Sequence, residues 1–471
     1  MSRRTGLALI ALSLAGCAVG PTYHPPMTAA PAHWSEAPLG GATDGAADVV
    51  EWWKTFKDPE LDSLVERAVA TNHDLRIATA RLREARAQRG AALWDALPIV
   101  GANASVVDSR ASKNGQLFSG VPLTTHTYDA GFDAGWEIDI FGGKRRAWEA
   151  ATAEVAASEE NRRDVLVSLL AEVARNYVEL RGSQRRLAIT HSNIQSQQAS
   201  LELAHSRFRG GMTSELDVTQ AAALLAGTQS QLPALESSLK QSMHRLGVLL
   251  AQEPGALVGE LSPEASIPST PPEVPVGLPS DLLRRRPDVR RAERQLASAT
   301  ARIGVETAEL FPKFSLVGAA GLQSLSASDW FTGGSRYGSV GPTVRWRILD
   351  FARIRSHIKA ANAREEQAVA TYEKAVLRSF EDVEDALVAY AKEQVRLESL
   401  REQVTAYERA LDLANQRYTA GLADFLNVLD AQRSLYQAQD TLVQSERTVT
   451  TNLIALYKAL GGGWTTLEQH A

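Results

Sequence analysis

The sequence predicts an α+β protein that is mainly α-helical and internally duplicated, with long coiled-coil helices and four strands per chain. Three observations support this fold class: one pattern of residues occurs twice, two pairs of segments alternate apolar and polar residues, and long stretches lack Gly and Pro. The 471 residues are 44% hydrophobic and carry a net charge of -5. Because this composition shows no basic excess, we expect no nucleic-acid partner.

The duplication appears as two sets of residues that recur at constant offsets of 214 and 210 residues. The first set contains Asp74, Arg76, Ala78, Leu82, Ala85, Gly90 and Pro98, which recur as Asp288, Arg290, Ala292, Leu296, Ala299, Gly304 and Pro312. The second set contains Trp136, Ile138, Phe141, Arg145, Arg207, Gly211, Val218 and Ala221, which recur as Trp346, Ile348, Phe351, Arg355, Arg417, Gly421, Val428 and Ala431. We therefore predict two copies of one module, at 61–260 and 280–463, with a linker at 261–279 and a tail at 464–471.

The N-terminus has the layout of a secretory signal peptide over residues 1–16, with a basic start, an apolar run and small residues before Cys17. Leu14 to Cys17 resembles the bacterial lipobox, whose cysteine is lipidated. Cys17 is the single cysteine of the chain, so it has no disulfide partner. We expect a lipidated, extended segment at 17–60; the alternative is an ordinary signal peptide with an incidental cysteine.

Two hairpins are predicted at about 99–139 and 313–348, because their residues alternate in character with a period of two. The expected strands are Ile99–Asp108, Tyr128–Asp139, Phe314–Gln323 and Tyr337–Ile348. Outside the leader no apolar run is long enough for a membrane-spanning helix, so a spanning structure would need a closed barrel. Four strands are too few to close one, and three copies would give a trimeric twelve-stranded transmembrane β-barrel. Two soluble hairpins are the alternative.

The long helices are predicted from stretches without Gly or Pro. Residues Ala352 to Ala420 would form a helix about 100 Å long before a turn at Gly421. The first copy should run from about Lys144 to Arg209, turn at 210–211 and return to about Leu250. Three residues should loosen or kink it, namely Gly182, Gly227 and Pro233. In the last helix a heptad repeat indicates a left-handed coiled coil, which fits a scaffold without a pore equally well.

Specific motifs resemble the outer-membrane factor lipoproteins of the OprM/NodT type, which are TolC-like. The segments that match are Cys17 to Pro21, Trp52-Trp53 with Phe56, Asp58 to Leu61, Asn72 to Arg76, Gly277 to Asp288 and Leu426 to Gln432. The resemblance implies a homotrimeric exit duct of a tripartite efflux pump of the resistance-nodulation-division type. Such a duct conducts small molecules passively from a periplasmic adaptor and an inner-membrane pump to the exterior. It implies a lipid anchor in the outer membrane of a Gram-negative bacterium and a part that extends into the periplasm.

The resemblance also implies functional positions at the two helical turns. The tip that docks a periplasmic membrane-fusion adaptor would contain Arg207, Gly210, Gly211, Arg417, Tyr418 and Gly421. A periplasmic gate would contain Asp217, Asp430 and Asn427. Rings of carboxylates favour cations and repel one another unless bridged, although an ordinary solvated helix face is the alternative. The chain departs from some relatives, because Asn427 stands where an acid can occur and Gln220 stands where the second copy has Asp430.

A search for catalytic and metal-binding patterns gives no candidate. The nine histidines lack the paired spacing of a zinc site, and Cys17 is assigned to the lipid. We therefore expect no enzyme activity, no metal and no cofactor beyond the covalent N-terminal lipid on Cys17. Two other functions remain open from the sequence: a type I secretion duct, and a non-conducting, lipid-anchored coiled-coil structural protein.

Overall fold

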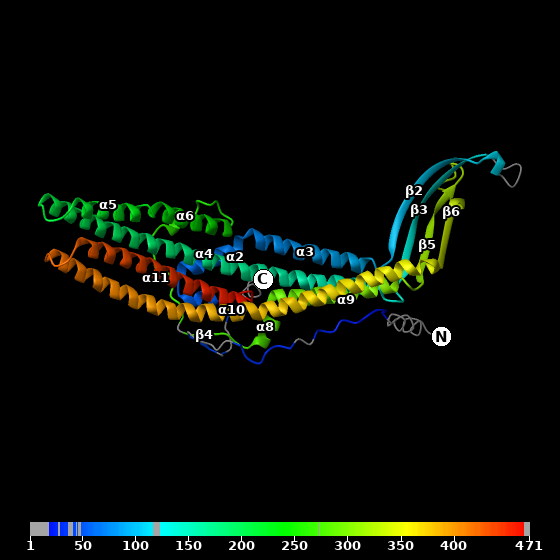
Figure 1. The fold of residues 1–471 in the computed structure, drawn as a ribbon. Helices are drawn as coiled ribbons and strands as arrows, with labels where there is room; N and C mark the ends of the chain where they lie inside the picture. The colour runs from blue at the N-terminus through cyan, green and yellow to red at the C-terminus, as the bar shows by residue number, and fades with distance from the viewer. Residues whose placement is uncertain are drawn as a thin grey trace. The chain divides into compact units, whose positions relative to one another are not determined.

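The computed structural model describes residues 18–26, 29–35, 41–43, 45, 49–115, 123–271 and 273–465. The predicted signal peptide, Cys17 and the end of the C-terminal tail lie outside these residues. The chain is mainly helical and contains one four-stranded sheet (Figure 1). It divides into two compact units, and each unit contains segments from both sequence copies. The compact units therefore differ from the predicted repeats, because the two copies are intertwined.

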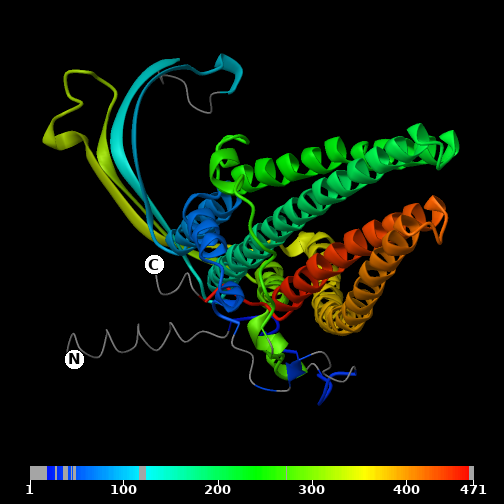
Figure 2. The same ribbon diagram turned by 90° about the vertical axis from the view of Figure 1, so that its left-hand side faces the viewer.

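The first unit consists of Met1–Met27, Arg81–Glu159 and Arg291–Glu373 and contains the sheet. Its strands are β2 (Ile99–Arg110), β3 (Thr124–Ile138), β5 (Lys313–Ser324) and β6 (Arg336–Arg345), all antiparallel and in the order β2-β3-β5-β6. Figure 2 shows them as one curved, twisted ribbon. The central strands β3 and β5 come from the first and the second copy and pair with each other, so the hairpins of both copies form one sheet.

The strand bounds differ from the prediction chiefly at the tip of the first hairpin and at the end of β6. The β2–β3 hairpin is longer than expected, because Asp108 pairs with His126 and the hydroxyls of Ser109 and Thr125 lie 2.7 Å apart. Strand β6 is shorter, since it ends at Arg345 and Ile348–Asp350 forms the 3-10 helix η4. The reason is the register: β5 begins at Lys313, opposite Arg345, so the residues after Arg345 have no strand to pair with.

The second unit consists of Thr28–Ala80, Glu160–Arg290 and Lys374–Ala471. In the described residues of both units the helices are α2 (Pro59–Thr71), α3 (His73–Trp94), α4 (Gly143–Arg209), α5 (Glu215–Gln229), α6 (Leu232–Leu249), α7 (Val258–Leu261), α8 (Pro279–Arg285), α9 (Pro287–Ala308), α10 (Phe351–Thr419) and α11 (Phe425–Ala459). The short elements are β1 (Ala42–Thr43), β4 (Val274–Pro275), and the 3-10 helices η1 (Trp52–Phe56), η2 (Lys113–Gly115) and η3 (Gly333–Ser335). Within this unit the long helices lie in the order α5, α4, α11, α10 (Figures 1 and 2).

The residues predicted to break the long helices differ in their effect on helix continuity. Helix α4 runs through Gly182 without a break. A Cβ there would lie 3.1 Å from the Arg447 side chain, so the glycine permits close approach of α11. The first copy breaks only on its return, between α5 and α6, just before Pro233. Proline is accepted in the first turn of α6, where its missing N–H is not needed.

The core of the second unit is built around an aromatic cluster. Trp52, Trp53 and Phe56 are all buried, and the Trp52 ring stacks on Tyr457 with centroids 5.3 Å apart. These three residues form η1, so the segment predicted as extended over 17–60 is not extended throughout. Burial of large aromatic side chains supplies much of the stabilisation of such a core. The buried residues of α4 and α11, with Tyr177 the largest from α4, surround the cluster.

No helix in the described part of the chain is long and apolar enough to cross a lipid bilayer.

Candidate functional site: the sheet and the helical tips

The strand register separates the sheet into an apolar and a polar face. Directly paired residues point to the same face, and successive residues alternate between faces. The apolar face contains Val100, Ala102, Ala104 and Val106 of β2, Tyr128, Ala130, Phe132, Ala134 and Trp136 of β3, Phe314, Leu316, Gly318, Ala320 and Leu322 of β5, and Val340, Pro342 and Val344 of β6. Several of its large side chains are exposed in the single chain, including Phe132 and Val340. Such a continuous apolar face is typical of a surface covered by lipid or protein.

The opposite face is polar and ordered by hydrogen bonds. Asp129 accepts hydrogen bonds from the Asn103 side-chain amide at 2.8 Å and the Gln323 amide at 3.5 Å. The Tyr337 ring lies over Gly131 and Gly321, where a Cβ would meet its atoms at 2.8 and 2.9 Å. Glycine therefore leaves the space that the tyrosine fills. Carboxylates, amides and hydroxyls thus predominate on this side of the sheet, which also carries Ile99, Val107 and Val317.

The two outer strands of the sheet, β2 and β6, each have one strand neighbour within the chain. An outer strand presents unpaired N–H and C=O groups, which proteins cover or pair. Here neither strand is short, since β2 spans 12 residues and β6 spans 10. Within the residues that the structure describes, the sheet is therefore open at both edges and is suited to pairing with further strands.

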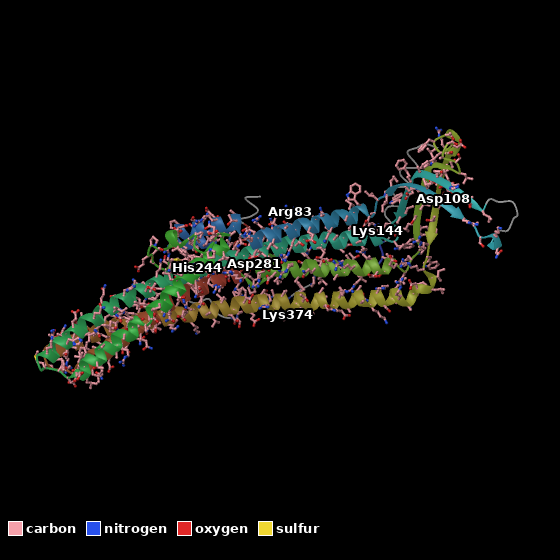
Figure 3. All side chains as sticks on the ribbon, turned by 90° about the horizontal axis from the view of Figure 1, so that it is seen from above. Arg83, Asp108, Lys144, His244, Asp281 and Lys374 are labelled. Atoms are coloured by element: carbon pink, nitrogen blue, oxygen red, sulfur yellow. The ribbon has the colours of Figure 1, made fainter. Side chains whose placement is uncertain are left out.

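The base of the sheet is the end at which β3 leads into α4 and β6 leads towards α10. Equivalent tryptophans of the two copies form hydrogen bonds there. The Trp136 indole donates to the Ala96 carbonyl at 3.0 Å, and the Trp346 indole donates to the Leu310 carbonyl at 3.1 Å. Asp139 follows β3 and accepts from the backbone N–H of Lys144 at 3.1 Å, so it caps the start of α4. Figure 3 labels Lys144 at this end of the sheet. These bonds fix the passage between strand and helix.

The residues that follow Cys17 lie against this same base. The Val19 N–H donates to the Phe141 carbonyl at 3.0 Å, and Arg146 donates to the Val19 carbonyl at 3.2 Å. Gly20, with φ of +88°, passes so close to Gly304 that a Cβ on Gly20 would lie 2.5 Å from the Gly304 Cα. Only glycine fits this approach. The segment that would follow a lipidated cysteine is therefore seated beside the strand ends.

Both helical turns end in the same capping structure. In the first copy Met212 N–H bonds to the Arg207 carbonyl at 2.9 Å and Gly211 N–H to the Phe208 carbonyl at 2.9 Å. In the second copy the Leu422 N–H bonds to the Arg417 carbonyl at 2.8 Å and the Gly421 N–H to the Tyr418 carbonyl at 3.0 Å. This is the Schellman pattern, and it requires positive φ, which Gly211 and Gly421 adopt at 72° and 74°.

Arg207 of the first copy connects the two tips by contacting the end of α10 in the second copy. The Arg207 guanidinium donates to the carbonyls of Tyr418 and Thr419 at 3.0 and 3.1 Å, and it lies 4.2 Å from the centre of the Tyr418 ring. Tyr418 is only 4% exposed and packs on Phe425 with ring centroids 5.0 Å apart. Arg207 thereby places a cation at the C-terminus of α10, where the helix dipole favours it. Tyr418 is therefore part of the tip's core, not of its surface.

The three predicted gate residues lie near the tips in different surroundings. Asp217 is in the first turn of α5 and accepts a hydrogen bond from the Thr213 hydroxyl. Asp430 and Asn427 are exposed on α11, and Asp430 forms an ion pair with Arg433 at 3.5 Å. An exposed pair of this kind contributes about 0–1 kcal/mol. Asp217 thus stabilises a helix start, whereas Asp430 is held only weakly within the chain.

The tips also expose apolar side chains that the sequence analysis did not single out. Met212 and Leu422, at equivalent positions after the turn glycines, are each 71% exposed. Leu216 and Leu426, also equivalent, follow at the starts of α5 and α11. The signal was present in the sequence as an apolar residue directly after each glycine. The exposure of that residue could not be predicted from the sequence, because the apolar residue after a Schellman cap usually packs against the preceding helix.

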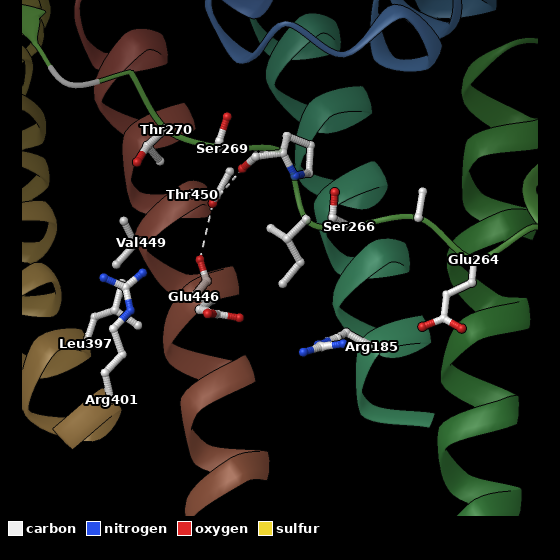
Figure 4. Close-up of a pocket in the computed structure, with 13 residues that line it drawn as sticks. Arg185, Glu264, Ser266, Ser269, Thr270, Leu397, Arg401, Glu446, Val449 and Thr450 are labelled. Atoms are coloured by element: carbon white, nitrogen blue, oxygen red, sulfur yellow. Dashed lines mark hydrogen bonds between the residues drawn. The ribbon is translucent and has the colours of Figure 1, made fainter. Parts of the chain in front are cut away.

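A cavity of about 840 Å³ in the second unit is lined by the linker at 264–270 and by α4, α10 and α11 (Figure 4). Two arginines, Arg185 and Arg401, and two carboxylates line it together with four hydroxyl side chains. Its Thr450 hydroxyl donates to the Glu446 carbonyl at 3.2 Å, which is an ordinary helical bond. Across the residues that the structure describes, no group of three or more His, Cys, Asp or Glu side chains could hold a metal ion.

Comparison with known proteins identifies the family. The outer membrane efflux protein family matches residues 64–252 and 278–462. The chain belongs to this family. It is 34% identical to the pyoverdine export outer membrane protein OpmQ of Pseudomonas aeruginosa, over 96% of this chain and 95% of that one. It is 33% identical to nodulation protein T of Rhizobium leguminosarum bv. trifolii, over 96% of each.

Solved structures show the same fold. The outer-membrane channel OprN superposes with a TM-score of 0.90 at 38% identity, covering 95% of this chain and 100% of that chain. The protein is therefore an outer membrane efflux protein of a Gram-negative bacterium and works as a channel within an efflux system. It is not an enzyme, since its family consists of efflux channels. Family membership also excludes the alternative of a non-conducting structural protein.

Proposed function

We propose that three copies of this outer membrane efflux protein close a twelve-stranded barrel and form the exit duct of a tripartite pump of the resistance-nodulation-division type. The observation that best supports the barrel is the four-stranded sheet with two open edges and opposite apolar and polar faces. Strand β2 of one copy would pair with β6 of the next, which removes both edges. The apolar face would contact outer-membrane lipid, and the polar face would line the duct.

We further propose that Cys17 is lipidated and anchors the protein in the outer membrane. The lipobox-like residues precede it, and the residues after it are seated against Phe141, Arg146 and Gly304 beside the strand ends. A lipid on Cys17 would then enter the membrane next to the barrel. Several acyl chains or a barrel are needed for stable attachment, and this arrangement supplies a barrel.

The helical tips are proposed as the docking site of a periplasmic membrane-fusion adaptor, through which an inner-membrane pump delivers small molecules. Gly210, Gly211 and Gly421 shape the turns, and Arg207 with Tyr418 holds the two turns together. The exposed Met212 and Leu422 provide the apolar contacts, and exposed apolar patches commonly mark interfaces. Arg417 is exposed at the same end.

The gate is proposed to consist of rings of Asp217, Asp430 and Asn427 at the periplasmic end. Three-fold assembly brings three copies of each carboxylate around one axis, where they repel unless bridged by cations. Asp430 supports this role, because it is exposed and only weakly paired within its own chain. Outward movement of the helix pairs would open the duct.

The test is single-channel conductance of the mature protein in planar bilayers, comparing wild type with Asp217→Ala/Asp430→Ala. Small or rare openings that enlarge in the double variant would support the gate. The matched control is Asp412→Ala, which removes an exposed carboxylate that is also paired three residues away, with Arg409. Conductance equal in all three proteins would remove the gate and keep the duct, whereas absence of conductance after verified insertion would contradict the duct.

A further inference from the structure

The two copies contribute unequally to the contact that holds the tips together. Arg207 of the first copy covers the C-terminal end of α10, and its equivalent in the second copy is Arg417. Arg417 is exposed, and in the described part of the chain no hydrogen bond or ion pair of its side chain is found. The guanidinium that has a partner in one copy is thus available in the other.

The aromatic residue at the helix end also differs between the copies in its exposure. Tyr418 is 4% exposed beneath Arg207, whereas its equivalent Phe208 is 43% exposed at the end of α4. The α4 end also has carbonyl groups that its helix cannot satisfy, as every helix C-terminus does. One chain therefore has an uncovered aromatic ring and helix end on the first copy, and an unused arginine on the second.

The order of the helices explains why these two features do not meet within one chain. The long helices of the second unit lie in the order α5, α4, α11, α10, so α5 and α10 are the outer helices. The inner contact between α4 and α11 contains Arg186 paired with Asp440 at 2.6 Å, and Asn193 bonded to Gln439 at 3.1 Å. A repeating arrangement would place α10 of one copy against α5 of the next.

We propose that Arg417 caps the α4 end of the neighbouring copy, donating to the carbonyls of Phe208 and Arg209 of the partner subunit and covering the ring of that Phe208. This inference rests on the homotrimer of the proposed function and adds the residues that join its subunits at the tip. It reproduces between subunits the contact that Arg207 makes within the chain. The closed ring would then have six equivalent arginine caps, three within chains and three between them.

The proposed seam has fewer ionic and amide side chains than the contact between α4 and α11, in which Arg186 pairs with Asp440 and the Gln432 amide donates to the Ser200 hydroxyl at 2.7 Å. At the positions equivalent to Asp440 and Gln432 stand Ser230 and Ala222. Asn193 and Gln439 correspond to Gln403 and Gln229, which keep hydrogen-bonding side chains and are both exposed. We expect the Arg417 cap and this glutamine pair to supply polar contacts at the seam.

Cysteine cross-linking tests the inference directly, because Cys17 is the only native cysteine. The variant Arg417→Cys/Phe208→Cys is treated with a short bis-maleimide, after its assembly state has been measured by native mass spectrometry in detergent. The matched control is Arg207→Cys/Tyr418→Cys, whose two positions touch within one chain. A second pair, Gln403→Cys/Gln229→Cys, probes the same seam without removing Arg417 or Phe208. Untreated wild type and each single-cysteine variant give the background.

The inference expects covalent dimers and trimers on denaturing gels from both seam pairs, and only a cross-link within the chain from the control. A trimer in which the control pair reacts while both seam pairs stay monomeric would overturn the inference and leave the proposed function intact. A wild type that is monomeric by native mass spectrometry would instead overturn the proposed trimer. If Arg417→Ala lowers adaptor binding while neither seam pair cross-links, Arg417 contacts the adaptor and not a second copy.

Discussion

In the core of the second unit, two equivalent side chains of the two copies donate a hydrogen bond to the end of a returning helix, but one is neutral and the other is charged. In the first copy the Asn72 amide donates to the Leu249 carbonyl at 2.8 Å, at the end of α6. In the second copy Arg286, at the position equivalent to Asn72, donates to the Ala459 carbonyl at 3.1 Å, at the end of α11. Both donors are buried. Each junction satisfies one of the last carbonyls of a returning helix, which would otherwise lack a partner.

The difference shows which part of the repeated module is fixed and which part is free to diverge. The donor at the helix end is needed in both copies, but its charge is not. Arg286 also bonds to Asp288 at 2.7 Å and to Asp382 of α10 at 2.8 Å, so it joins three helices, whereas Asn72 additionally accepts from the Leu75 N–H. The second junction therefore depends on a buried charge, and the first does not.

The largest expected effect is that of Arg286→Ala. Its removal leaves Asp288 and Asp382 without their shared cation and the Ala459 carbonyl without its donor. Because both carboxylates are partly exposed and can be solvated by water, we expect a loss of about 2–4 kcal/mol in the free energy of unfolding. Guanidinium unfolding followed by far-UV circular dichroism measures it. The control is the neighbouring exposed Arg284→Ala, which should change stability by less than about 0.5 kcal/mol. Equal effects of both substitutions would contradict the assigned role.

Asn72→Ala should have a smaller effect, because no charge is left unpaired. It leaves the Leu249 carbonyl and the Leu75 N–H without side-chain partners, which we expect to cost about 1–3 kcal/mol in the same unfolding experiment. His73→Ala, at the adjacent exposed position, is the control. A loss as large as that of Arg286→Ala would show that charge does not distinguish the two junctions.

The tips provide a second comparison between the copies. Arg207→Ala removes two hydrogen bonds and one cation–π contact from the α10 end, so we expect a local loss of about 1–2 kcal/mol. Hydrogen–deuterium exchange of residues 415–422 should then accelerate roughly 5- to 30-fold, since about 1.4 kcal/mol corresponds to tenfold. The exposed Arg209→Ala should leave exchange there unchanged. Unaltered exchange in Arg207→Ala would refute the cap.

The smallest effect concerns pH and α2, which leads into Asn72. Burial raises the pKa of the Asp62 carboxyl above its usual value, with partial opposition from Lys54, so folding disfavours its charged form. The folded state then binds more protons than the unfolded state between the two pKa values, and stability falls as pH rises through that window. Asp62→Asn should stabilise by less than about 1 kcal/mol at pH 7 and have no such benefit at pH 3. A gain of equal size at both pH values would exclude this cause.

Much of the fold was predictable, because its signals are local. Alternation over Tyr128 to Ile138 indicated the strand and its two faces, and the isolated Gly421 indicated the second tip, where it adopts positive φ. The outcomes that the sequence did not predict depend on distant partners. Strand β6 stops at Arg345 because of where β5 begins. Gly182 lies inside an unbroken helix, where the missing Cβ leaves room for Arg447 of α11.

The sequence by itself determined the duplication, the helix and strand periods and the turn glycines, since each follows from the chemistry of neighbouring residues. Only the tertiary structure decided that Tyr418 is buried beneath Arg207 while its equivalent Phe208 is exposed. Likewise, only the fold decided that Asn72 and Arg286 donate to the ends of equivalent helices, α6 and α11. Burial and hydrogen bonding depend on residues hundreds of positions apart, and two copies of one pattern become different once each packs against different neighbours.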